Sequence, residues 1–268
     1  MTHSPPLLVG NLLREWRQRR RMSQMELSFE AEVSTRHLSF VETGRATPSR
    51  EMVMLLAERL DVPLRERNAL LIAAGFAPVF PTRTLADPAL AAAREAVEMV
   101  LTAHEPYPAL AIDRHWTLVT ANEAARRLLG GIAPELLKVP VNVMRLSMHP
   151  AGLAPRIANF RQWRSHLLAR LRHQIEITAD PLLRELAKEV GSYPVPKTHT
   201  PAEPLPGSEV ANMVVPLHLV TDSGVLSLLS TTTVFGTAVE VTISEIALEN
   251  FYPMNADSAA LLHRLAEE

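Results

Sequence analysis

A run of arginines near the N-terminus offers the chemistry of anion recognition. Five arginines lie within residues 14–21, where Glu15 is the only acidic residue. Guanidinium groups form planar, paired hydrogen bonds with phosphate and carboxylate groups. Such a run is typical of a solvated helix face, and it is equally typical of a surface that binds nucleic acid. Charge alone does not decide between the two, so the elements that carry these residues have to be considered.

Other kinds of chemistry have little support in the sequence. The chain has no cysteine, which excludes disulfides, thiol nucleophiles and cysteine-bound zinc or iron–sulfur clusters. Its ten histidines show no metal-binding spacing such as H-E-x-x-H, and no G-x-S-x-G, P-loop or G-x-G-x-x-G motif occurs. We therefore expect neither an enzyme nor a metal or cofactor site.

Length and composition indicate a globular protein of one large or two modest domains. The chain has 268 residues, of which 47% are hydrophobic and 21% charged, with a net charge of −2. That charge is uneven, at +2 over residues 1–75 and −4 over the remainder. No apolar run approaches the roughly 20 residues of a membrane span, and the N-terminus lacks a signal-peptide core. We expect a cytoplasmic, nucleoid-associated protein with no membrane contact.

Residues 7–75 show the spacing of five short helices. Ser23 and Glu26 form a capping-box pair that starts the second helix. Ser34 is the candidate N-cap of the third helix, which is expected to end at Gly44. The sequence therefore predicts an all-helical N-terminal domain.

Three segments of this domain match a known pattern. They are S-Q-M-E-L at 23–27, V-S-T-R-H-L-S at 33–39 and E-T-G-R at 42–45. The match resembles the helix-turn-helix of phage-repressor-like (xenobiotic response element, XRE) transcription regulators. One departure is Glu32, which stands where that family commonly has glycine in the turn. A positive φ there costs a residue with a side chain about 1 kcal/mol or more.

The resemblance implies that the third helix reads the major groove of double-stranded DNA. By alignment, Arg36 can bind guanine through two hydrogen bonds and Phe40 can contact a thymine methyl group. Glu42 is expected to pair with an arginine of the first helix. The alternative is a five-helix domain that binds a protein partner. The residues expected at DNA are Gln24, Ser34, Thr35, Arg36, His37, Ser39, Phe40, Arg45, Thr47 and Ser49.

The rest of the chain predicts an α/β domain with an antiparallel sheet. Two short strands joined by a turn at Asp113–His115 lead into a helix that Asn122 caps. This opening resembles a PAS-type sensor fold. The expected organisation is a helix-turn-helix domain at 1–76, a linker at 77–88 and a PAS-like ligand-binding and dimerisation domain at 89–268. Three further strands at 210–220, 224–235 and 239–249 complete a five-stranded sheet, with helices at 89–103, about 155–177, 180–190 and 256–266.

The order of these parts resembles the MmyB-like transcription regulators. The carriers are N-x-x-A-x-x-L from Asn122, N-V-M-R-L-S-M-H-P at 142–150 and a long Arg/Trp helix. That resemblance implies a homodimer and a PAS-like pocket that holds a long-chain fatty acid. A symmetric dimer would place two recognition helices about 34 Å apart and read an inverted repeat. The proline-rich stretch 193–206 departs from the family, and we expect a surface tether or a lid there.

A fatty acid suits the apolar strand positions and the polar residues near them. The aliphatic chain would lie on inward strand residues, and its carboxylate would bind polar side chains of 142–159. Two alternatives remain, a sensor that holds haem or flavin and a domain that only dimerises or recruits a protein partner. The expected ligand contacts are Leu110, Ile112, Trp116, Leu118, Asn142, Arg145, His149, Arg156, Asn159, Met213, Val215 and Leu217.

Overall fold

The structure is a computed structural model that describes residues 9–196, 214–235 and 240–267. Met213 and most of the proline-rich stretch 193–206 lie outside these residues, so the expectations about them are not addressed. Within the described ranges, no helix has both the length and the apolar composition needed to cross a membrane.

Contacts divide the chain into two compact units. The helical unit comprises Met1–Thr84 together with Thr237–Ser244. The sheet unit comprises Leu85–Gly236 and Glu245–Glu268. The chain therefore contributes to the helical unit twice, the second time from the connection between the last two strands of the sheet. The sequence did not indicate this second contribution.

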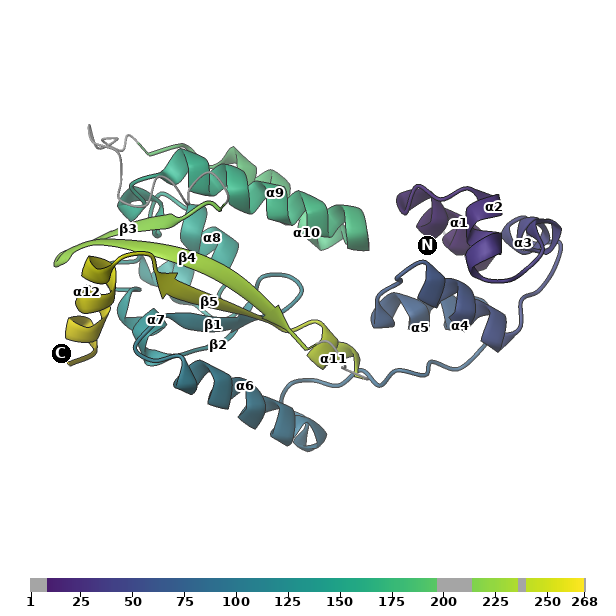
Figure 1. Ribbon diagram of the computed structural model, residues 1–268, viewed down its shortest axis with the longest axis horizontal. Helices are drawn as coiled ribbons and strands as arrows, with labels where there is room; N and C mark the ends of the chain where they lie inside the picture. The colour runs from purple at the N-terminus through teal and green to yellow at the C-terminus, as the bar shows by residue number, and fades with distance from the viewer. Residues whose placement is uncertain (1–8, 197–213, 236–239, 268) are drawn as a thin grey trace. The chain divides into compact units, whose positions relative to one another are not determined.

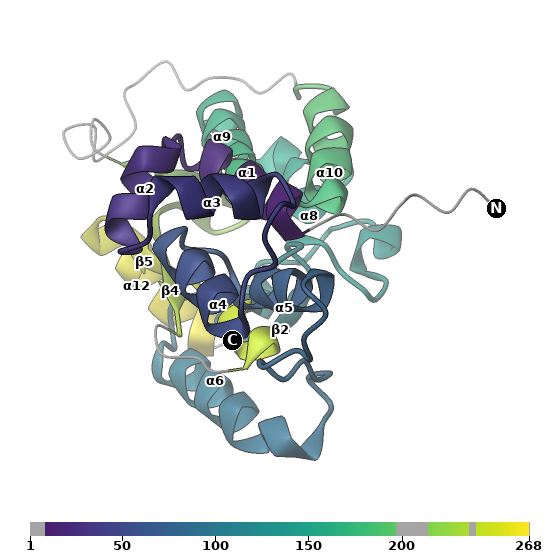
Figure 2. The same ribbon diagram turned by 90° about the vertical axis from the view of Figure 1, so that its right-hand side faces the viewer.

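The helical unit contains the five expected helices (Figures 1 and 2). Helices α2 and α3 lie side by side and form the helix-turn-helix (Figure 2). The core is apolar, and Leu13, Leu38 and Leu70 are fully buried in it. The helices are α1 (Val9–Arg19), α2 (Gln24–Glu30), α3 (Thr35–Glu42), α4 (Arg50–Arg59) and α5 (Leu64–Ala73).

Local capping starts α2 and α3 where the sequence predicts. The Ser23 hydroxyl accepts a hydrogen bond from the Glu26 backbone N–H at 3.1 Å, and the Glu26 carboxylate accepts one from the Ser23 N–H at 2.6 Å. The Ser34 hydroxyl accepts from the His37 N–H at 3.1 Å. Glu32, in the turn, has a φ of 53°, so a residue with a side chain occupies the left-handed conformation that glycine favours.

Gly10 allows α1 to approach α3 closely. A Cβ atom at this position would lie 2.2 Å from the Val41 carbonyl oxygen and 2.9 Å from that of Glu42. Both contacts are with backbone, which cannot move aside as a flexible side chain can. The end of α3 is therefore held directly against the first turn of α1.

The sheet unit is built on the predicted five-stranded antiparallel sheet. The strand order is β2-β1-β5-β4-β3, so the two hairpins of the sequence meet through the β1–β5 pair. Leu110 pairs with Glu249, which places both residues on the same face of the sheet. The strands are β1 (Ala109–Ile112), β2 (Leu118–Ala121), β3 (Leu217–Thr221), β4 (Gly224–Val234) and β5 (Ala247–Pro253).

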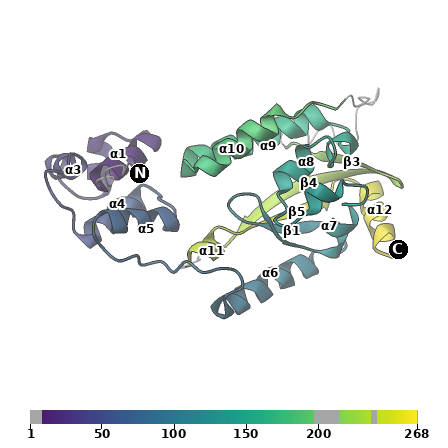
Figure 3. The same ribbon diagram turned by 180° about the vertical axis from the view of Figure 1, so that it is seen from behind.

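Helices cover both faces of this sheet (Figures 1 and 3). Helices α8, α9 and α10 lie on one face and α6 lies on the other, whereas α12 packs against β4. The Asn122 side chain caps α7 by accepting from the Ala125 N–H at 3.0 Å, as expected. The helices are α6 (Ala91–Ala103), α7 (Glu123–Arg127), α8 (Val143–Met148), α9 (Phe160–Thr178), α10 (Pro181–Ser192) and α12 (Ala256–Glu267).

The strand predicted at 239–249 requires correction. Its first half contains a helical turn, α11 (Val241–Ser244), and β5 begins only at Ala247. The Glu240 carboxylate explains the difference, because it accepts hydrogen bonds from the Ile243 N–H at 2.9 Å and the Arg83 N–H at 3.0 Å. Since these contacts belong to the helical unit, the β-branched residues of this segment do not pair in the sheet.

Candidate nucleic-acid interface and ligand cavity

The first turn of α3 is exposed to solvent. Ser34, Thr35 and Arg36 are all exposed, and the Thr35 hydroxyl lies 2.8 Å from that of Ser28 on α2. This hydroxyl contact ties the two helices of the motif together. The Arg36 side chain is exposed, and its guanidinium lies beside the Phe40 ring.

Phe40 supports two guanidinium groups. The guanidinium carbon of Arg36 lies 5.4 Å from the centre of the Phe40 ring, and that of Arg45 lies 6.0 Å from it. The Phe40 ring itself is half-buried. A cation above an aromatic face is attracted by the ring quadrupole, so Phe40 orders both arginines as well as offering its edge to a base.

Glu42, at the end of α3, is buried and forms hydrogen bonds with the side chains of Arg17 and Gln24. We call these three residues the Glu42 cluster. The Glu42 carboxylate accepts hydrogen bonds from Arg17 Nε at 2.7 Å and Arg17 Nη2 at 2.8 Å, which confirms the predicted pair with the first helix. The Gln24 amide donates to the same carboxylate at 2.8 Å. The hydrogen bond to Glu42 raises the pKa of Arg17 despite the burial that opposes it. The Glu42 cluster therefore fixes the orientation of α3. The Gln24 amide, which was expected at a phosphate, takes part in this cluster.

The other residues expected at DNA surround this helix. Thr47 is exposed, whereas His37 and Ser39 are half-buried. The Ser49 hydroxyl caps α4 by accepting from the Met52 N–H at 3.2 Å. Two exposed apolar side chains on α2 were missed by the sequence analysis, Met25 at 71% and Phe29 at 84% exposure. Their spacing of one helical turn, outside the core pattern, was the signal that could have found them.

The sheet unit contains an apolar cavity of about 110 Å³, counted as the space open to the centre of a water molecule. It lies between the sheet and helices α7, α8 and α9. We call it the ligand cavity. Its walls are Pro108, Leu110, Trp116, Ala125, Leu128, Leu129, Val143, Met144, Leu146, Ser147, Leu153, Trp163, Leu167, Arg170, Leu217, Leu219, Leu228, Glu249 and Phe251.

The ligand cavity has a single charged end. Arg170 of α9 and Glu249 of β5 line it and form a double hydrogen bond, with Nη2–Oε1 and Nη1–Oε2 distances of 2.5 and 3.1 Å. The Glu249 side chain is only 6% exposed, whereas that of Arg170 is 25% exposed. The Thr232 hydroxyl donates to Glu249 at 2.9 Å and accepts from Arg170 at 2.9 Å. This end of the cavity therefore carries both signs of charge, already paired.

Trp116 connects the cavity wall to this pair. The Arg170 guanidinium carbon lies 4.9 Å from the centre of its ring, and the indole N–H donates to Gln174 at 2.8 Å. Its φ of 64° places the backbone in the left-handed region, in the turn before β2. Trp116 is thus a residue of the turn and not of a strand, and α9 contacts its side chain at the ring face through Arg170 and at the indole N–H through Gln174.

The structure revises the expected apolar contacts of the ligand. Leu110, Trp116 and Leu217 line the cavity as anticipated. Ile112 and Val215 belong to the surrounding core without lining the cavity, and Leu118 packs with a separate small cluster.

The polar residues expected at the ligand carboxylate form hydrogen bonds with other groups of the protein. Arg145 forms two hydrogen bonds of 2.8 Å with Glu189. Arg156 donates to the carbonyl oxygens of Gly130, Leu128 and Val220 at 2.8–3.1 Å, and so ties loops together. None of the remaining members of this set lines the cavity.

The other three members of that set also bond to backbone. Asn142 caps α8 by accepting from the Arg145 N–H at 3.2 Å. Asn159 donates to the Pro216 carbonyl at 2.8 Å and accepts from the His218 N–H at 3.1 Å. The His149 imidazole accepts from the Ala151 N–H at 3.0 Å. Each side chain thus forms hydrogen bonds with backbone groups of a loop or a helix end. The sequence offered no means of distinguishing this role from ligand binding.

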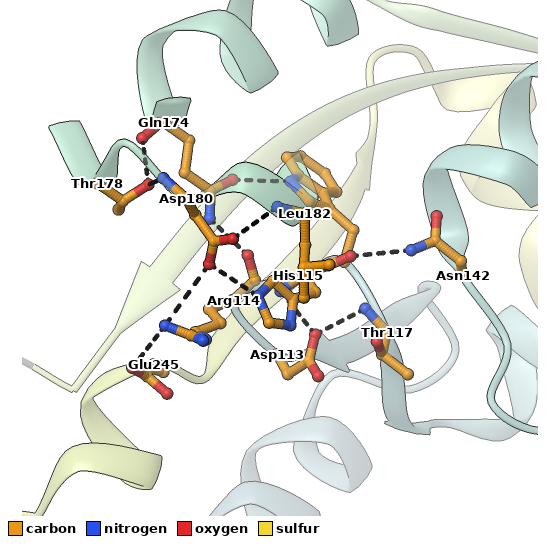
Figure 4. Close-up of polar contacts among 11 residues, drawn as sticks. Asp113, Arg114, His115, Thr117, Asn142, Gln174, Thr178, Asp180, Leu182 and Glu245 are labelled. Atoms are coloured by element: carbon orange, nitrogen blue, oxygen red, sulfur yellow. Dashed lines mark hydrogen bonds and ion pairs between the residues drawn. The ribbon is translucent and has the colours of Figure 1, made fainter. Parts of the chain in front are cut away.

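Arg114, His115, Gln174, Asp180 and Glu245 take part in a polar network (Figure 4). Asp180, the N-cap of α10, lies 2.8 Å from His115 Nε2 and 3.6 Å from Arg114 Nη1. Arg114 also lies 3.7 Å from Glu245, and its carbonyl accepts from the Gln174 amide at 2.7 Å. The network therefore joins the β1–β2 turn, the α9–α10 junction and Glu245, two residues before β5.

Asp180 is the titratable centre of this network. Burial raises the pKa of its carboxyl, but hydrogen bonds from His115 and the Leu182 N–H and the positive charge of Arg114 outweigh it, so the pKa is lowered overall. The carboxylate is therefore held ionised. Across the described ranges, no group of three or more histidine, aspartate or glutamate side chains is placed to hold a metal ion.

A helix-turn-helix unit joined to a sheet unit with an apolar cavity defines a ligand-binding transcription regulator. Residues 13–67 match the helix-turn-helix family, and residues 93–265 match the family described as the MmyB-like transcription regulator ligand binding domain. The second match covers more than half of the chain. The chain therefore belongs to the MmyB-like transcription regulators, and both family resemblances seen in the sequence are confirmed.

Comparisons with individual proteins add little. No curated protein matches the chain. Among solved structures, one described as an RNA-binding light-oxygen-voltage receptor shares 15% sequence identity, with a TM-score of 0.25. The alignment covers 97% of this chain, which spans only 64% of the receptor chain. A likeness this weak supports no argument about the present protein.

Proposed function

We propose that this protein is a homodimeric transcription regulator whose DNA binding responds to a fatty-acid-type ligand, meaning an aliphatic chain with one polar end. The observation that carries the proposal is the ligand cavity, whose described lining residues are apolar except for Ser147 and the Arg170–Glu249 pair. Such a regulator works in the compartment that holds the DNA, so we place it in the cytoplasm at the nucleoid.

The helical unit supports reading of DNA through α3. Its exposed first turn presents Thr35 and Arg36, and the buried Arg17–Glu42 pair keeps the helix in a fixed orientation. Thr47 and the Arg45 guanidinium are also exposed and suit phosphate contacts. In a two-fold dimer, two copies of α3 separated by about 34 Å match an inverted repeat with half-sites one helical turn apart.

The size of the ligand cavity supports an aliphatic chain. By the same measure of volume, one water molecule needs about 10–15 Å³. The cavity of 110 Å³ therefore accepts about seven to eleven groups of the size of a methylene. At about 0.8 kcal/mol for each buried methylene, eight of them contribute at most about 6 kcal/mol. A chain of about eight to ten carbons fits without rearrangement, and a longer one requires movement of lining side chains.

Haem or flavin fits this site less well. Ligands of that size occupy pockets of about 300–1,000 Å³, and the cavity is much smaller. No histidine is among the described residues that line it, although histidine is the commonest ligand of haem iron in sensor proteins. These two observations favour a flexible chain over a rigid planar cofactor.

The polar network in Figure 4 offers a route from ligand to DNA-binding unit. Trp116 lines the cavity and bonds to Gln174, which bonds to the carbonyl of Arg114, whose side chain contacts Glu245. Glu245 directly follows Ser244, the last residue of the segment that belongs to the helical unit. We propose that a ligand against Trp116 shifts this route and thereby biases the placement of the two α3 helices in the dimer.

Two measurements on the full-length protein test this function. Native mass spectrometry with solvent extraction should find a dimer and a copurified aliphatic molecule. Fluorescence anisotropy on a DNA site selected from a random pool should then show that removing or adding acids and alcohols of eight to fourteen carbons changes DNA affinity. If none of these compounds changes the affinity for DNA, the proposal of ligand control is contradicted. The sheet unit would then be interpreted as a domain that only dimerises or recruits a protein partner.

A further inference from the structure

The charged end of the ligand cavity is electrically balanced before any ligand arrives. Arg170 and Glu249 both line the cavity, and two hydrogen bonds join their side chains. Thr232 bonds to both partners at 2.9 Å and closes the set. His166, one turn before Arg170 on α9, has a lowered pKa because of its burial and the nearby Arg170 charge. Among the described residues that line the cavity, no uncompensated positive charge therefore remains.

An ionised carboxylate head group meets an obstacle in this arrangement. To bind Arg170 it must approach the carboxylate of Glu249, which is only 6% exposed and is held by Arg170 and Thr232. Two carboxylates that share one site repel each other, and one of them must take up a proton or move away. Moving Glu249 away would leave a buried charge without its partner, which is strongly unfavourable.

An uncharged polar head group meets no such obstacle. A hydroxyl group can donate one hydrogen bond and accept two, so it can donate to Glu249 and accept from Arg170 at once. A guanidinium group has five N–H donors, and the bonds of Arg170 to Glu249 and Thr232 engage only its two terminal nitrogens. The pair thus presents an acceptor and a donor side by side, which matches an alcohol, an amide or a protonated acid.

We infer that the Arg170–Glu249 pair is the specificity determinant of the ligand cavity and selects aliphatic ligands with an uncharged polar head over ionised carboxylates. The inference rests on the proposed function, because it requires that the cavity be a ligand site. Glu249 is the residue that rejects the anion, and Arg170 rejects a cationic head group for the reciprocal reason.

Calorimetric titration of the full-length protein with sodium decanoate and with 1-decanol tests the inference at about pH 7, where an aliphatic carboxyl is ionised. The quantity compared is the ratio of the two dissociation constants, decanoate over decanol. Using the ratio between variants cancels the intrinsic difference in hydrophobicity of the two compounds. Glu249→Gln keeps the shape of the side chain and removes its charge, so this ratio should fall by about tenfold or more.

A matched control comes from Arg145 and Glu189, an Arg–Glu pair of the sheet unit that is also joined by two hydrogen bonds. Glu189 accepts two 2.8 Å hydrogen bonds from Arg145, as Glu249 does from Arg170, but neither Glu189 nor Arg145 lines the cavity. Glu189→Gln should leave the ratio unchanged. The reciprocal variant Arg170→Gln should instead favour decylammonium over decanol by about tenfold relative to the wild type. It also keeps the inference testable if Glu249→Gln fails to fold.

The outcomes separate the inference from the proposed function. If both compounds bind and neither Glu249→Gln nor Arg170→Gln changes the preference for charge, head-group selection by this pair is wrong while the ligand site stands. The same holds if Glu189→Gln changes the ratio as much as Glu249→Gln does. If neither compound binds the wild type, the ligand site itself fails, and the inference falls with it.

Discussion

Replacing Arg17 by methionine tests the claim that the Glu42 cluster orients α3. The Arg17 side chain is 10% exposed and that of Glu42 is 1% exposed. Methionine fills a similar length but leaves the Glu42 carboxylate with the Gln24 amide, at 2.8 Å, as its remaining side-chain donor. Removing one partner of a buried pair costs about 3–5 kcal/mol, because the other charge stays desolvated without compensation. The helical unit should lose that much stability.

Hydrogen exchange of the full-length protein measures the effect where it arises. Amides of α1 and α3 should exchange about a hundredfold to several thousandfold faster, since 1.36 kcal/mol corresponds to a factor of ten. Arg19→Met is the matched control on the same helix, because Arg19 pairs with Glu15 at 3.5 Å and their side chains are 30% and 49% exposed. That change should cost less than about 1 kcal/mol.

A double variant distinguishes two costs of the Arg17→Met substitution. One is the desolvation penalty of the unpaired Glu42 carboxylate, and the other is the loss of the attraction between Arg17 and Glu42. Replacing both members, Arg17→Met with Glu42→Leu, removes the buried charge and should recover most of the stability that the single variant loses. Equal exchange rates in Arg17→Met and Arg19→Met would refute the reasoning. A double variant less stable than Arg17→Met would refute it as well, because the penalty could not then come from an uncompensated carboxylate.

Four further predictions concern DNA, ligand, pH and coupling. Arg36→Ala should weaken binding to the selected DNA site by about 1–3 kcal/mol and relax preference at one base pair; an equal loss on every sequence would make Arg36 a phosphate contact instead. Leu167→Phe adds volume to the cavity wall and should weaken ligand binding in calorimetry while DNA affinity without ligand is unchanged. The pKa of Asp180 is lower in the folded than in the unfolded protein, where it is about 4. Ionised Asp180 therefore adds to the free energy of unfolding above about pH 4, and this contribution is lost as the pH falls through the folded pKa. Asp180→Asn should therefore be less stable than the wild type in denaturant titrations at neutral pH, with a difference that vanishes in acid. Arg114→Met should retain binding of both ligand and DNA but lose the effect of one on the other, and an undiminished ligand effect on anisotropy would exclude the proposed route.

The sequence by itself determined the features that depend on neighbours along the chain. The capping box of Ser23 and Glu26 and the caps formed by Ser34 and Asn122 occur where they were expected. A cap joins residues three apart, so the short segment contains all the information required. The turn that Glu32 occupies with a φ of 53° follows from the same local match. The alternation that predicts a five-stranded sheet is likewise a local signal.

Tertiary structure decided which polar side chains meet the cavity. Arg145 and Arg170 both adjoin apolar segments, and no property of their own sequence neighbours separates them. Their acidic partners, Glu189 and Glu249, lie 44 and 79 residues further along the chain. Packing alone brings Glu249 and Arg170 to the cavity and keeps Arg145 out of its lining.

The same reason explains the misplaced strand. Residues 239–249 have the composition of a strand, but the described part of this segment bonds to backbone atoms of Pro81 and Arg83, about 160 residues earlier. A pattern of side chains predicts what a segment favours in isolation, whereas these hydrogen bonds depend on where the rest of the chain lies. Local propensity therefore specified the elements of this protein, and contacts between distant residues specified its cavity, its charged pair and the second contribution to its helical unit.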